Sequence, residues 1–191
     1  MKNRMTARLR RLTARSLPFV VAVVAGVAGW QLGPWLLDRT QPALPARNIQ
    51  QLAALTLPDL HGQPQALAQW QGQVLVVNLW AAWCPPCRAE MPGFSRLQDK
   101  YAGRKVQFVG IALDTAENVV DFVQTTPVHY PLLMGSSALL PTFAELGNSS
   151  GSLPFTAVFD AAGQLRHIHR GYWREGELDD ILGELAVMMA K

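Results

Sequence analysis

The chain has 191 residues, 49% hydrophobic and 16% charged, which suits one domain and is too apolar for a disordered protein. Six of its basic residues lie among the first fifteen, and the remainder carries 11 basic and 14 acidic residues, a net charge of −3. That balance argues against nucleic-acid binding, and two cysteines exclude a disulfide-rich scaffold and an all-cysteine zinc site.

The amino-terminal region predicts a membrane anchor. Residues 17–37 hold no charged side chain, and as a helix they would span roughly 31 Å, the thickness of a bilayer's hydrocarbon core. The basic leader at 1–16 predicts a cytoplasmic amino terminus, which places the following chain across the membrane. Residues 38–50 contain two prolines and indicate a linker, so the folded domain is expected at 51–191.

Two other interpretations of this region are open. A cleavable signal peptide is one, because Gly26, Val27 and Ala28 offer a possible cleavage site. Apolar residues continue well beyond that site, which favours an uncleaved anchor. A buried helix of a soluble protein is the other, and the one-sided distribution of basic residues disfavours it. With either an anchor or a signal peptide, the domain is exported.

The first half of the predicted domain alternates strands and helices. Residues 74–80 form a continuous apolar run that predicts a central strand buried on both faces. A helix is expected at 88–101, with a kink at Pro92. A second buried strand at 106–113 and a helix at 116–124 follow. This order predicts parallel pairing of the two strands through a right-handed crossover.

The ends of the domain carry shorter signals. Residues 155–160 and 164–172 flank a turn and predict a β-hairpin. Residues 177–191 predict an amphipathic closing helix. Ahead of the central strand, residues 57–67 predict a small hairpin.

The two cysteines lie between the first central strand and the following helix, in the sequence WCPPC. Two thiols three positions apart at a helix start can form a disulfide, and the amides there favour a thiolate. Cys84 is expected to be the exposed nucleophile, and Cys87, one turn into the helix, to resolve the mixed disulfide. A purely structural disulfide is the alternative. Covalent haem attachment is disfavoured because Arg88 follows Cys87.

Residues beside the cysteines bear on their reactivity. Pro85 and Pro86 have no N–H to stabilise a Cys84 thiolate, which predicts a redox potential nearer about −270 mV than about −120 mV. Glu90 lies on the helical face of Cys87 and is a candidate for exchanging protons with the pair. A solvated glutamate is the alternative. Trp83 is expected to contact clients.

The segment from Asn78 to Pro92, NLWAAWCPPCRAEMP, resembles the active-site segment of thioredoxin-like proteins, and most of all the membrane-anchored TlpA/ResA/CcmG branch. Residues 152–160, SLPFTAVFD, resemble the family's cis-proline strand. The resemblance covers about residues 55–185. It implies an α/β thioredoxin-like fold, with a central mixed β-sheet flanked by helices, that follows the transmembrane helix.

The same resemblance implies roles for individual residues. Pro154 is expected to be cis and to lie opposite Cys84, leaving the backbone of Leu153 to pair with a client peptide. Glu90 matches the glutamate of ResA-like proteins, which implies a role in acid–base chemistry or in tuning pKa values. Asn78 stands where thioredoxin itself has an acidic residue, so no buried carboxylate is expected at that position.

We therefore predict a thiol:disulfide oxidoreductase in the periplasm, held at the bacterial inner membrane by one span, that reduces disulfides of exported proteins. The resemblance implies clients in cytochrome c maturation or copper-site assembly, and a membrane electron donor of the CcdA/DsbD type. No cofactor, metal or nucleic acid is expected. A disulfide oxidase is the nearest alternative. A non-catalytic dithiol copper carrier or client-binding module is an alternative of another class.

Four further side chains are assigned by position. Trp80 is expected in the core, and Phe155 either in the core or in the client groove. His167 and His169 alternate onto one face of the predicted hairpin. That face favours a solvated edge over a metal site.

Overall fold

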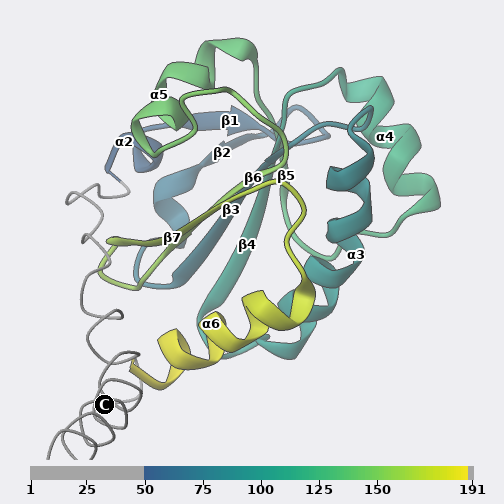
Figure 1. The fold of residues 1–191 in the computed structure, drawn as a ribbon. Helices are drawn as coiled ribbons and strands as arrows, with labels where there is room; N and C mark the ends of the chain where they lie inside the picture. Colours follow the sequence, from purple (N-terminus) through teal and green to yellow (C-terminus); the bar gives the residue numbers. More distant parts are fainter. Residues whose placement is uncertain (1–49, 189–191) are drawn as a thin grey trace, which may run out of the picture. The chain divides into compact units, whose positions relative to one another are not determined.

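A computed structural model describes residues 50–188, within which the elements follow one another as shown in Figure 1. The predicted leader, the predicted membrane span and, apart from Gln50, the predicted linker lie outside this range. No helix in residues 50–188 combines the length and the apolar character needed to cross a bilayer.

Five strands form one mixed sheet in the order β5-β4-β3-β6-β7 (Figure 1). Their bounds are β3 (Val74–Trp80), β4 (Val106–Ala112), β5 (Leu132–Met134), β6 (Phe155–Phe159) and β7 (Leu165–Arg170). β3, β4 and β5 run parallel, whereas β6 is antiparallel to β3 and to β7. The predicted parallel pair and the predicted carboxyl-terminal hairpin are both confirmed.

A smaller antiparallel pair precedes the sheet. It consists of β1 (Thr56–Pro58) and β2 (Pro64–Ala66), which confirms the small hairpin predicted at 57–67. The short helix α2 (Gln50–Ala53) lies before it, and the 3-10 helix η1 (Leu67–Trp70) follows it.

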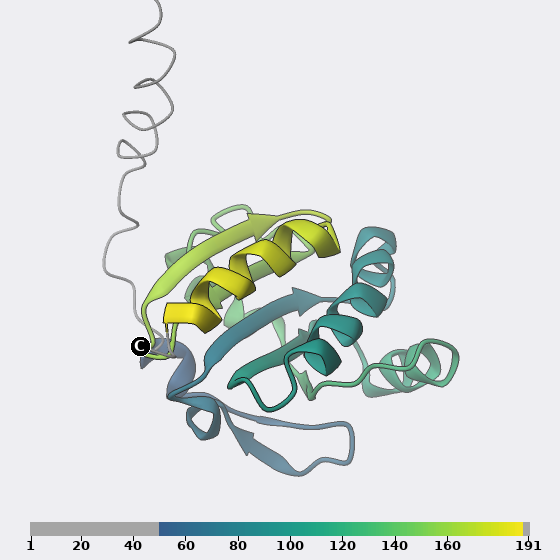
Figure 2. The same ribbon diagram turned by 90° about the horizontal axis from the view of Figure 1, so that it is seen from below.

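Helices cover both faces of the main sheet. They are α3 (Pro85–Lys100), α4 (Ala116–Thr125), the 3-10 helix η2 (Ser137–Leu139), α5 (Leu140–Glu145) and α6 (Glu175–Met188). α3 contacts α6, and the two lie next to each other in Figure 2. Ion pairs join them across this contact, between Arg96 and Glu175 and between Lys100 and Asp179.

The helix bounds correct two predictions. α3 begins at Pro85 rather than at residue 88, because a proline is tolerated where a helix has no partner for its first N–H groups. As predicted, α3 continues beyond Pro92, and it ends at Lys100. α6 begins at Glu175, two residues before the predicted start.

The core has two layers, one on each side of β3. Leu75, Val77 and Leu79 pack in the layer with η1 and α5, and Val76 and Trp80 pack in the layer with α3, α4 and α6. All seven residues of β3 are buried, which explains the continuous apolar run in the sequence. Asn78 is the one polar residue among them, and it is 1% exposed.

Candidate active site

The dithiol lies where the chain leaves β3 and enters α3. Cys84 is the N-cap of α3, its N–H donates to the carbonyl of Ala81, and its carbonyl accepts from the N–H of Arg88. Cys84 and Cys87 form a disulfide, with 5.3 Å between their Cα atoms. The two residues between the cysteines thus place both cysteines within a single turn at the start of α3.

The two sulfurs differ in their surroundings. Cys84 is 4% exposed and Cys87 is fully buried. The expectation of an exposed Cys84 is therefore too strong for the oxidised form, because its sulfur is bonded to Cys87 and packs in the apolar layer around α3. The N–H of Cys87 donates to Cys84 Sγ at 3.4 Å, whereas Pro85 and Pro86 have no N–H to offer.

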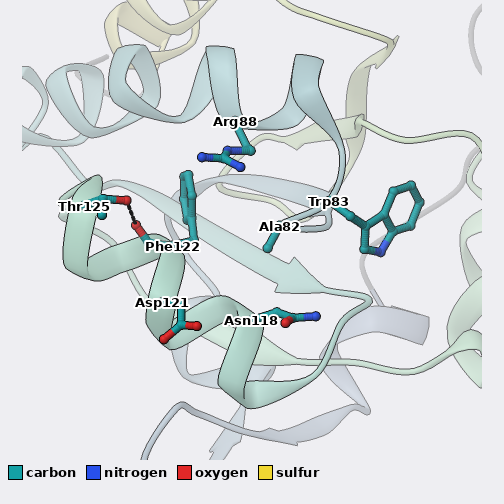
Figure 3. A pocket seen from close by; sticks show the side chains of 7 residues that line it. All are labelled: Ala82, Trp83, Arg88, Asn118, Asp121, Phe122 and Thr125. Carbon is teal, nitrogen blue, oxygen red and sulfur yellow. Dashed lines mark hydrogen bonds between the residues drawn. The ribbon is translucent and has the colours of Figure 1, made fainter.

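A groove of about 310 Å³ opens beside the dithiol, between the start of α3 and α4 (Figure 3). Phe122 and Ala82 line its apolar part, and the guanidinium of Arg88 lies 5.4 Å from the centre of the Phe122 ring. Trp83 stands at the end of the groove and is 67% exposed. An exposed indole next to the cysteine pair is available to contact another molecule.

Glu90 is a buried carboxyl, 2% exposed, and not the solvated glutamate of the alternative interpretation. Its Oε1 accepts from Asn78 Nδ2 at 2.9 Å, and its Oε2 accepts from the N–H of Trp173 at 2.9 Å. Burial raises the pKa of Glu90 to about 7, against the two hydrogen bonds, which lower it. Glu90 can therefore hold or release a proton near neutral pH, one turn after Cys87.

Asn78 connects Glu90 to the sheet. Its Nδ2 also donates to Thr156 Oγ1 at 3.0 Å, and Thr156 is its register partner on β6. Asn78 is thus one of the two donors that hold the carboxyl of Glu90 in place. Position 78 thus carries an amide where thioredoxin has an acidic residue, and the buried carboxyl near the dithiol belongs to Glu90 on α3.

The segment before β6 contains the predicted proline. The peptide bond between Leu153 and Pro154 is cis, and Pro154 directly precedes β6 at the end of the sheet where β3 leads into the dithiol. Asn148, 1% exposed, holds this segment through its side chain. Its Oδ1 accepts from the N–H and the hydroxyl of Ser152, and its Nδ2 donates to the carbonyl of Ser152.

Replacing Asn148 with alanine is expected to destabilise the protein by about 1 kcal/mol, because the half-buried backbone of Ser152 loses its partners. Urea denaturation of the oxidised protein measures this. Asn118→Ala is the matched control, because Asn118 is exposed on α4 and should change stability by less than about 0.5 kcal/mol. Equal stabilities of the two variants would contradict the role of Asn148.

The remaining assigned residues lie in the core or at its edge. Trp80 and Phe155 are fully buried, so Phe155 belongs to the core and not to the groove. The ring of His169 stacks on Trp173 with centroids 4.7 Å apart. In residues 50–188, no group of three or more histidine, cysteine or acidic residues could hold a metal ion.

Sequence reasoning missed two residues of the site, Asn148 and Trp173. Asn148 follows a helix end and precedes a run of small residues, a pattern typical of a turn that gives no sign of burial. Trp173 acts through its backbone N–H, so no side-chain pattern could have pointed to it.

The model of the AhpC/TSA family matches residues 49–168 of this chain. The chain belongs to the AhpC/TSA family. This AhpC/TSA protein is 42% identical over 179 residues to the "Thiol:disulfide interchange protein DsbE homolog" of Paracoccus denitrificans, covering 89% of this chain and 93% of the relative. It is 25% identical over 188 residues to the thiol-disulfide oxidoreductase ResA of Oceanobacillus iheyensis, covering 96% and 94% of the two chains.

Solved structures agree with the fold of this AhpC/TSA protein. The crystal structure of a thioredoxin-family thiol:disulfide interchange protein from Chlorobium tepidum matches with a TM-score of 0.63 and 30% identity, covering 69% of this chain and 92% of that chain. The predicted thioredoxin-like fold and family are confirmed. The names of the relatives agree with the thiol:disulfide oxidoreductase activity predicted from the cysteine pair.

Proposed function

We propose that this AhpC/TSA protein reduces specific disulfides in exported proteins, using Cys84 and Cys87. The observation that carries the proposal is a disulfide at the start of α3 with a buried carboxyl, Glu90, one turn further on. The proposed setting is the periplasm, with residues 17–37 anchoring the chain in the inner membrane. A mature protein that retains residues 1–16, shown by mass spectrometry of the membrane fraction, would separate an anchor from a cleaved signal peptide.

The proposed reaction transfers two electrons from the dithiol to the client. The Cys84 thiolate attacks one sulfur of the client disulfide, forms a mixed disulfide and releases the first client thiolate. Cys87 loses its proton to Glu90 and attacks Cys84 Sγ. The second client thiolate leaves, and Cys84 and Cys87 end as a disulfide. A thiol donor must then reduce this disulfide, for which a membrane protein of the CcdA/DsbD type is proposed.

The start of α3 supports the reducing direction. The stronger the stabilisation of the Cys84 thiolate, the more oxidising the couple, and in the structure Cys84 Sγ accepts only from the N–H of Cys87. We expect a redox potential of about −270 mV, measured by equilibrating the protein with glutathione or dithiothreitol. A potential above about −180 mV would instead support a disulfide oxidase.

The clients are proposed to be proteins of cytochrome c maturation or of copper-site assembly. The groove beside Trp83 and the backbone of Leu153, which precedes the cis Pro154, are proposed to bind the client chain on either side of its reactive cysteine. Trp83, Pro85 and Pro86 form the surface that a client crosses to reach Cys84. The resemblance to the TlpA/ResA/CcmG branch is the support for this client class.

Reduction of insulin by the prereduced protein tests the proposed activity. Turnover in the presence of dithiothreitol supports an oxidoreductase. A chain that binds unfolded clients or copper but does not reduce insulin, or any native disulfide client, would support a binding module or copper carrier instead.

A further inference from the structure

Three buried side-chain atoms have no hydrogen-bond partner among residues 50–188: Asn78 Oδ1, Trp80 Nε1 and the hydroxyl of Tyr130. Such atoms are rare in protein interiors, because leaving a buried polar group unpaired costs about 1–3 kcal/mol. A cluster of them therefore indicates a partner that this part of the chain does not provide.

The three residues surround a single glycine. Gly110 on β4 is the register partner of Asn78, and Trp80 lies two residues further along β3 on the same face. A methyl group on Gly110 would approach Leu132 Cδ2 to 2.6 Å, Trp80 Nε1 to 3.1 Å and Tyr130 Cε2 to 3.3 Å. The indole nitrogen and the phenol ring thus both lie beside Gly110, the register partner of Asn78.

The chemistry of the three atoms is complementary to water. The indole N–H of Trp80 only donates, Asn78 Oδ1 only accepts, and the hydroxyl of Tyr130 does either. A water molecule can accept from Trp80, donate to Asn78 and bond to Tyr130, and buried waters typically make about three such bonds. We propose that Asn78, Trp80 and Tyr130 bind one internal water molecule, which holds the Asn78 amide in the orientation that donates to Glu90.

The orientation of Asn78 matters because its two amide ends have opposite effects on Glu90. In the structure Nδ2 donates to Glu90 Oε1 and to Thr156 Oγ1. A turned amide would point Oδ1 at the carboxylate and favour its protonated form. Water bonded to Oδ1 opposes that turn and polarises the amide into a better donor. Trp80 and Tyr130 are thus positioning residues for Glu90.

This arrangement bears on the charge of Glu90 at neutral pH. The titratable side chains on the elements around Glu90 include the Cys84–Cys87 pair on α3, Tyr130 before β5, and His169, which stacks on Trp173. The other titratable side chains of α3 are exposed: Arg88, Arg96, Asp99 and Lys100. Burial, and then the charge of Glu90, raise the pKa of Tyr130 well above its usual range, so its hydroxyl stays neutral. The role of Glu90 rests on the proposed function, whereas the water site does not.

Nuclear magnetic resonance of the oxidised protein tests the proposal. We expect a cross-relaxation peak between the indole N–H of Trp80 and a long-lived water in the wild-type protein. Tyr130→Phe should weaken this peak. It should also lower the ratio of ionised to protonated Glu90 near neutral pH about twofold, which is measured from the ¹³C chemical shift of the Glu90 carboxyl. Tyr172→Phe is the matched control, because Tyr172 is 49% exposed.

Two results would overturn the proposal. One is a wild-type Trp80 N–H that shows no contact with water, a result that needs no variant. The other is a Tyr130→Phe protein that is more stable than the wild type while the titration of Glu90 is unchanged, since the hydroxyl would then be simply unpaired. Neither measurement uses thiol exchange, so the proposed function is judged separately by insulin reduction.

Discussion

Cys84→Ser is expected to lower the rate of insulin reduction by roughly 10³-fold or more, to the level of the uncatalysed exchange. Cys84 is the N-cap of α3, its sulfur accepts the N–H of Cys87, and it is the less buried of the two cysteines. Cys87 is fully buried and cannot replace it. The rate should be measured with the prereduced protein and dithiothreitol as the reductant.

Cys87→Ala should have a different effect, because Cys84 can still attack but nothing displaces the client. In cells that express the full chain, stable mixed disulfides should accumulate on Cys84 and separate into their partners after reduction. Cys84→Ala is the control and should form no adducts. Recovery of adducts on Cys87 would reverse the assignment, and absence of adducts from Cys87→Ala would favour a carrier or client-binding module.

Glu90→Gln is expected to remove a large pH dependence of stability. Because the pKa of Glu90 rises from 4.5 in the unfolded chain to about 7 in the fold, folding favours its protonated form. Its contribution is fully present below pH 4.5 and is lost as the pH rises to about 7. The loss amounts to about 3 kcal/mol, which Glu90→Gln should abolish.

Urea denaturation of the oxidised protein across this pH range measures the effect. Glu117→Gln is the control, because Glu117 is exposed on α4 and should leave the pH dependence as in the wild type. In the reduced protein, Glu90→Gln should also slow exchange by about 10²-fold, because Cys87 loses its proton acceptor. Unchanged stability profiles and unchanged titrations of both thiols would together remove Glu90 from the mechanism.

The buried strands could be predicted because their burial on both faces produces a recognisable sequence pattern. β3 and β4 are covered on both faces, so each appears as an uninterrupted apolar run, and the intervening helical spacing fixes their parallel order. β5 was missed because it has three residues, too few to show a strand pattern in the sequence. α5 was missed because its six residues, which include Pro141, give no clear helical period.

Some residues of the site could likewise be predicted from the sequence, and others could not. The cysteines and Glu90 were predictable because their chemistry depends on side-chain type and on spacing along one helix. The burial of Glu90 was not, since it depends on Trp173, which lies 83 residues away in the chain. The hydrogen bonds of Asn148 and the convergence of Trp80 and Tyr130 likewise depend on contacts between distant segments.

Glu90 contacts position 173 through a main-chain N–H, which every amino acid except proline provides. Any residue but proline would keep the N–H that Glu90 Oε2 accepts, whereas a smaller side chain would lose the buried indole that stacks on His169. The hydrogen bond to Glu90 is thus independent of the side chain at position 173, whereas the burial of Glu90 is not.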